Sequence, residues 1–124
     1  MDKIIVKNLK LFCYYGVNPE EKIDGQNFVF DIEATVDLSI PCVTDNVDDT
    51  VSYAKIIKTV RRVAQSEKND LLEHVAQRVA DELFSEFDKI NSLVITLKKP
   101  EAPIKADFDY VAVTIERTRE WKRI

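Results

Sequence analysis

The side chains of this sequence that can move protons are carboxylates, tyrosines and lysines, because the common motifs of other chemistries are absent. The 124 residues contain no glycine-rich phosphate loop, no G-x-S-x-G elbow and no H-E-x-x-H metal motif. A single histidine, His74, excludes most histidine-based triads that need a second partner. The only cysteines, Cys13 and Cys42, make no zinc site with it at any usual spacing. An enzyme built on this sequence therefore uses carboxylate, tyrosine or lysine for acid–base catalysis.

Two adjacent lysines, Lys98 and Lys99, end a segment that alternates like a strand, and the alternation separates them. Lys99 shares its parity with the large apolar side chains, whereas Lys98 lies on the opposite parity. Lysines at strand ends are usually solvated, but one on the core-facing parity can point into a partly buried pocket. Lys99 is therefore the better candidate for chemistry and Lys98 the weaker one. The apolar set is Leu93, Ile95 and Leu97.

The distribution of charge argues against nucleic acid as the main ligand. The formal net charge is -4, and acidic and basic residues are interspersed along most of the chain. Phosphate binding needs concentrated positive charge, which occurs only at the C-terminal end. We interpret that end as a solvated tail. Its basic residues are Arg117, Arg119, Lys122 and Arg123.

No segment predicts export or membrane insertion. The N-terminal MDKIIVKNLK carries charges where a signal peptide needs an apolar run. No apolar stretch approaches the roughly 20 residues that span a bilayer. We expect a cytoplasmic protein with no membrane partner and with both thiols free in a reducing compartment.

Residues 27–38 carry the clearest secondary-structure signal, an alternation that predicts a long strand with one buried face. The β-branched and aromatic residues 4–15 predict a preceding strand, joined to it by the turn residues between them and paired antiparallel. The apolar positions of the long strand are Phe28, Phe30, Ile32, Ala34, Val36 and Leu38, and they alternate with Val29, Asp31, Glu33, Thr35 and Asp37.

Two helices are expected after a polar loop at residues 39–51. Apolar residues fall at helical spacing over residues 53–64 and again over residues 72–87. Asp70 and Glu73, at the start of the second helix, have the spacing of a capping box.

Two further strands, at residues 92–98 and 109–117, complete the order β-β-α-α-β-β. This order predicts an α+β fold of two layers, in which one four-stranded antiparallel sheet carries both helices on one face. Residues 1–124 are expected to form a single domain. The other face of the sheet is mixed in polarity, so it either faces solvent or lines the interior of a ring of subunits.

Four segments resemble, in order and spacing, the signature segments of the dihydroneopterin aldolase family. Each segment alone is a weak signal, but four in register within the matching order of strands and helices are specific. The match runs from Ile4 to Arg117. The segments are GVNPEE with GQNF at residues 16–28, TDNVDDTVSY at 44–53, LLEHVA at 71–76 and KKPEAPI at 98–104.

The resemblance implies a pterin site that is anchored by Glu73. A pterin presents a ring N–H and an exocyclic amine side by side, and a carboxylate accepts both in a forked pair. The backbone at Leu72 helps to frame the ring. A carboxylate turned back to its own helix cap cannot also grip a ligand, so the capping and anchoring roles of Glu73 compete. We interpret His74 as a bystander.

The resemblance also implies that Tyr53 is a proton carrier beside the pocket of a neighbouring subunit. The residues alone predict instead that Tyr53 packs in the core with its hydroxyl at the rim. Val51 and Ser52 then contact the bound ring through backbone or side-chain groups.

Glu21 and Lys99 complete the catalytic set that the resemblance implies. Glu21 helps to bind and orient the side chain of the substrate, and Glu20 is the alternative if the loop spacing slips by one. Gln26 also matches a family position and sets the loop. The KPxAP register selects Lys99 over Lys98.

The implied reaction is a retro-aldol cleavage of folate biosynthesis, which makes the enzyme an aldehyde-lyase. 7,8-Dihydroneopterin is split between C1′ and C2′ to 6-hydroxymethyl-7,8-dihydropterin and glycolaldehyde. The C=N bond of the ring takes up the electrons, so no cofactor, metal or Schiff-base lysine is required. Lys99 handles the 2′-hydroxyl proton, and Tyr53 protonates the enol-like intermediate. Closing that intermediate on its other face gives 2′-epimerisation as a side activity.

The resemblance further implies the tunnelling fold, whose subunits join strands edge to edge into tetrameric rings. Two rings stack, usually as an octamer, with active sites between adjacent subunits; a tetramer is the alternative. Two rival functions are an epimerase acting on dihydroneopterin or its triphosphate and a non-catalytic, ring-forming binding module. The presence of Glu21, Tyr53, Glu73 and Lys99 argues against the binding module.

Overall fold

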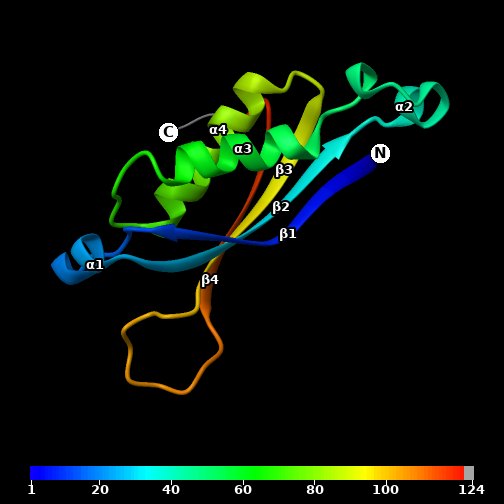
Figure 1. Ribbon diagram of the computed structural model, residues 1–124. Coiled ribbons are helices and arrows are strands. Elements are labelled where there is room, and N and C mark those ends of the chain that lie inside the picture. The colour runs from blue at the N-terminus through cyan, green and yellow to red at the C-terminus, as the bar shows by residue number, and fades with distance from the viewer. Residues whose placement is uncertain (122–124) are drawn as a thin grey trace.

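One antiparallel sheet runs through the molecule and positions everything else (Figure 1). The computed structural model describes residues 1–121. Adjacent strands in space are also adjacent in sequence, and both outer strands are edges. The strands are β1 (Asp2–Cys13), β2 (Gln26–Val36), β3 (Ile90–Lys99) and β4 (Val111–Thr118), in the order β1-β2-β3-β4. The predicted four-stranded antiparallel sheet is confirmed.

Two helices, α3 (Tyr53–Ala64) and α4 (Leu72–Glu86), cover one face of this sheet, as predicted (Figure 1). The Ser52 side chain accepts a hydrogen bond from the Lys55 N–H and so begins α3, since an N-cap oxygen satisfies a donor that the helix leaves free. The core between helices and sheet is apolar. Its largest fully buried side chains include Phe28, Phe30, Ile32, Ile56, Leu83, Ile95 and Leu97.

The alternation of β2 separates the two faces of the sheet. Phe28, Phe30 and Ile32 are buried beneath the helices, whereas Val29 and Asp31 are only half-buried on the other face. Burial with a period of two requires a covered face and an open face, and the predicted alternation of this strand is therefore confirmed.

Three short helices lie where a turn and a loop were predicted, and that part of the prediction was wrong. They are α1 (Pro19–Asp24), α2 (Ser39–Thr44) and the 3-10 helix η1 (Val47–Asp49). Local bonds explain them: Pro19 has the fixed φ that suits a first helical position, and the Asn46 side chain accepts from the Asp48 N–H. Helices of fewer than two turns leave too little periodicity to be predicted.

The predicted solvated tail was also wrong for Arg117 and Arg119. Arg119 donates hydrogen bonds to the carbonyl oxygens of Phe84, at 2.8 Å, and of Phe87, which ends α4. A guanidinium is favourable there because the last carbonyls of a helix lack partners and carry partial negative charge. Arg117 donates to Gln77 Oε1 at 2.7 Å. The remaining basic residues of that prediction, Lys122 and Arg123, lie outside the described residues.

Two findings bear on the predicted compartment. Within residues 1–121, no helix is long and apolar enough to cross a membrane. Cys13 and Cys42 are free thiols, the first buried and the second exposed.

Candidate active site

Among residues 1–121, the most enclosed charged pair joins the end of β3 to α1. Lys99 Nζ forms an ion pair with Glu21 Oε2, and the two side chains are only 12% and 8% exposed. Lys99 extends the core-facing row of β3, as its parity predicted, and so meets the carboxylate near the sheet's rim. A paired acid and base at a partly buried edge is the arrangement that proton transfer requires.

The Glu21 carboxylate is held from several sides besides Lys99. Gln26 Nε2 donates to Oε2 and the Asn18 backbone N–H donates to Oε1, both at 3.3 Å. Gly16 leaves the room for it, because a Cβ at that position would collide with the carboxylate, and its φ of +147° disfavours other residues. The carboxylate is therefore fixed in place before any ligand binds.

These contacts shift the ionisation of Glu21. Burial opposes the charged form, but hydrogen bonding and charge from Lys99 favour it, helped by Asn18 and Gln26, so the pKa of Glu21 lies below its ordinary value. Glu21 is therefore a carboxylate at neutral pH.

Geometry distinguishes the members of the two residue pairs, Glu20/Glu21 and Lys98/Lys99, that the sequence left open. Glu20 is exposed, and its side chain has no hydrogen bond or ion pair among residues 1–121, so Glu21 is the carboxylate that meets Lys99. Lys98 points to the open face of the sheet, where it pairs with Asp31 Oδ2 at 2.9 Å and donates to Asn8 Oδ1 at 3.1 Å.

The start of α4 lies beside this pair, but not through the predicted capping box. Leu71 is the N-cap, without a side-chain cap, and the Asp70 carboxylate pairs with Lys22 of α1 instead. The capping-box prediction was therefore wrong, because the Asp70 side chain forms an ion pair with Lys22 and does not cap the helix. Glu73 is exposed, and among residues 1–121 its carboxylate has no hydrogen bond or ion pair. It is free to accept a ligand.

A backbone contact brings α4 to the site. The Gly16 N–H donates to the Asn69 carbonyl at 3.0 Å, and Tyr15 forms an isolated parallel bridge with Asn69. The turn after β1 and the segment before α4 are thereby joined, which places Leu72 and the exposed Glu73 on the same side of the molecule as α1 (Figure 1). Neither contact was visible in the sequence, because both use backbone atoms.

Tyr53 is not in the core. Its side chain is 68% exposed at the start of α3, so the core-packing prediction was wrong. Twelve residues of helix, roughly 18 Å at 1.5 Å per residue, separate this end of α3 from the end that faces α4's start. Figure 1 shows α1 at one end of the helical layer and the start of α3 toward the other. One chain therefore does not bring Tyr53 to Glu21 and Lys99.

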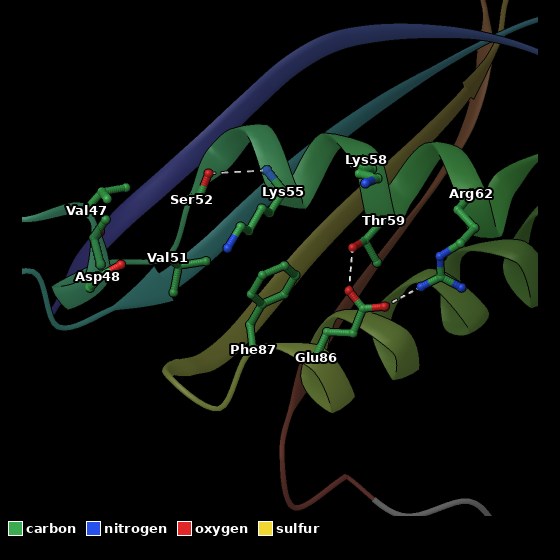
Figure 2. A pocket seen from close by; sticks show the side chains of 11 residues that line it. Val47, Asp48, Val51, Ser52, Lys55, Lys58, Thr59, Arg62, Glu86 and Phe87 are labelled. Carbon is green, nitrogen blue, oxygen red and sulfur yellow. Dashed lines mark hydrogen bonds and ion pairs between the residues drawn. The ribbon is translucent and has the colours of Figure 1, made fainter.

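A separate groove of about 790 Å³ lies beside the start of α3 (Figure 2). Val51 and Ser52 line it, and the Lys55 side chain points into it toward Phe87. Neither Tyr53 nor Glu21, Glu73 or Lys99 lines the groove. We therefore place the candidate chemistry at the Glu21–Lys99 pair, where acid and base groups meet, and not in this groove.

A comparison with protein families identifies the family to which this chain belongs. The family model described as "FolB: Dihydroneopterin aldolase" matches residues 4–116 of this chain. The chain belongs to the dihydroneopterin aldolase family.

Within the part of the chain that the structure describes, no group of three or more His, Cys, Asp and Glu residues could hold a metal ion.

Curated relatives and solved structures agree with this family. A Streptococcus pyogenes serotype M1 dihydroneopterin aldolase is 34% identical, covering 96% of this chain and 100% of its own length. Dihydroneopterin aldolase 1 of Arabidopsis thaliana is 38% identical, covering 95% and 82%. The E. coli dihydroneopterin aldolase, solved in complex with neopterin, superimposes with a TM-score of 0.87 at 35% identity, covering 94% and 99%. The predicted tunnelling fold is thereby confirmed.

The lowered pKa of Glu21 predicts how acid weakens this part of the fold. A carboxyl whose pKa is lower in the folded state stabilises the protein above the ordinary value of 4.5 and loses this effect as the pH falls through the folded-state pKa. Glu21→Gln should therefore lower the Tm at pH 7, and its difference from the native protein should shrink below pH 4.5. Thermal scans at one protein concentration measure this.

Glu20→Gln is the matched control, since the Glu20 side chain is exposed and unpaired within the described residues 1–121, and it should leave the Tm unchanged throughout. A Tm deficit of Glu21→Gln that stays constant with pH would contradict the charged pair.

Proposed function

We propose that this chain catalyses the family's retro-aldol reaction at a site shared by two subunits. Glu73 and Leu72 bind the pterin ring, Glu21 and Lys99 act on its side chain, and Tyr53 comes from the neighbouring subunit. The observation that carries the proposal is the enclosed Glu21–Lys99 pair beside the exposed Glu73 carboxylate, which has no partner among residues 1–121. The neopterin held by the E. coli relative supports a pterin as the ligand.

The ring-binding end of the site follows from the chemistry of a free carboxylate at a helix start. Glu73 lies in the first turn of α4, where backbone N–H groups without helical partners favour negative charge. An ionised carboxylate offers two acceptor oxygens to the ring N–H and exocyclic amine of a pterin. The Leu72 backbone lies next to it and frames the same edge of the ring.

The reaction end needs a proton moved from oxygen and a proton delivered to carbon. Removal of the 2′-hydroxyl proton forms the C=O of glycolaldehyde, breaks the C1′–C2′ bond and sends the electron pair into the C=N bond of the ring. Lys99 passes a proton of its ammonium to the paired Glu21 carboxylate and takes up the departing proton in its place, and Glu21 also orients the substrate's hydroxyls. Tyr53 returns a proton to C1′, which completes 6-hydroxymethyl-7,8-dihydropterin.

Assembly is part of the proposal because one chain holds only part of the site. Tyr53, Val51 and Ser52 lie at the far end of α3 from Glu21, so a second copy must supply them. The outer strands β1 and β4 leave two unpaired edges, and pairing them between copies closes a ring. We propose tetrameric rings that stack into an octamer. The free thiols suit a cytoplasmic setting.

Glu73→Ala should abolish detectable pterin binding, because the ring edge loses its only forked acceptor. Glu73→Gln should weaken binding strongly as well, since an amide offers one acceptor oxygen where the carboxylate offers two. Calorimetric titration with neopterin measures both. The exposed neighbour His74 provides the control, and His74→Ala should bind normally. Unchanged affinity of Glu73→Ala would exclude the anchoring role.

The native protein should release glycolaldehyde from 7,8-dihydroneopterin, and Lys99→Ala should lower kcat by roughly 10²–10⁴-fold, the usual contribution of a general acid–base group. KM should change much less, because Glu73 still binds the ring. Lys105→Ala, an exposed lysine in the loop after β3, is the control. Isomerised substrate without glycolaldehyde would indicate an epimerase instead, and a normal kcat of Lys99→Ala would exclude Lys99 from proton transfer.

A further inference from the structure

The backbone pairing of β2 with β3 ends beside the Glu21–Lys99 pair, and a side-chain hydrogen bond continues the contact between the two segments. The end pair is Val29 with Lys98, and two residues later Pro100 has no N–H to continue the sheet. Beyond it, Glu101 Oε2 accepts a hydrogen bond from the Asn27 backbone N–H at 3.0 Å. A carboxylate therefore occupies the place that a strand carbonyl would otherwise fill.

This hydrogen bond completes a closed chain of contacts that includes the candidate catalytic pair. Lys99 pairs with Glu21, Glu21 accepts from Gln26, and the next residue, Asn27, donates to Glu101. Glu101 returns to Lys99 through a single proline. Gln26 and Lys99 are thus held at a fixed separation by contacts on both sides, although 72 residues of chain lie between them.

On the side of β2, the strand pairing of β3 reaches only as far as Lys98. Its ammonium pairs with Asp31 Oδ2 on the open face of the sheet, at 2.9 Å. Lys99 itself pairs with Val111 of β4, but its contact with the β2 side runs through Glu21 and Glu101. The contact to Asn27 therefore holds the first residues of the loop that follows Lys99.

We propose that Glu101 is a positioning residue, which keeps Lys99 aimed at Glu21 and at the substrate by clamping the end of β3 to the start of β2. It touches neither substrate nor reacting atoms, and it acts through the Asn27 N–H. This inference rests on the proposed role of the Glu21–Lys99 pair.

Glu101→Ala should lower kcat for 7,8-dihydroneopterin between about 10- and 100-fold, because displacements near 1 Å have effects of this order. KM should stay within about twofold, since the ring-binding residues on α4 are untouched. Glu101→Gln should recover most of the rate, because its amide oxygen can accept the same hydrogen bond. Deuterium exchange read by mass spectrometry should be faster at Asn27 in Glu101→Ala and nearly normal in Glu101→Gln.

Asp107→Ala is the matched control, an exposed acidic residue of the same loop without a partner among residues 1–121, and it should change neither readout. A native kcat in Glu101→Ala would overturn the inference, as would a Glu101→Gln variant as slow as Glu101→Ala. Lys99→Ala, measured alongside, separates a failure of the inference about Glu101 from a failure of the proposed catalytic pair. If it is slow while Glu101→Ala is normal, only the clamp is refuted; if it is normal, the proposed catalytic pair fails as well.

Discussion

The ion pair between Glu21 and Lys99 is the interaction on which the rest of this site depends. Both side chains are almost enclosed, so each would be costly without the other. Breaking one partner of a buried pair typically costs about 3–5 kcal/mol, because an uncompensated charge remains. Gly16 makes room for the carboxylate, and Gln26 satisfies it. The sheet's edge is therefore built to hold two charges together where a substrate can reach them.

That constraint is the reason why we propose a site shared between two subunits. The pair is fixed at one end of the helical layer by α1 and the end of β3, while Tyr53 is displayed at the other, 68% exposed. An exposed tyrosine next to a buried Val51 contributes little to the core of its own subunit. In the proposed assembly, a second copy places Tyr53 against the Glu21–Lys99 pair, and the chemistry then needs the subunit interface as much as the fold.

Sequence patterns predicted the regular elements well, because periodicity directly reflects burial. The alternation in residues 27–38 and the parity of Lys99 both placed side chains on the correct face of the sheet. Contacts between distant segments were not predictable: the Asp70 side chain pairs with Lys22 rather than capping α4, and Glu101 meets the Asn27 N–H. These depend on short helices and loops, whose geometry is set by the folded surroundings and leaves no period in the sequence.

The shared site is tested most directly by mixing two impaired subunits. Lys99→Ala and Tyr53→Phe chains, each slow alone, are unfolded together in equal amounts, refolded and assayed for glycolaldehyde release. If each site takes Lys99 from one subunit and Tyr53 from its neighbour, random assembly restores about a quarter of the sites, and activity should rise to about a quarter of the native value. Activity no higher than the average of the two separate variants would contradict a site built across the interface.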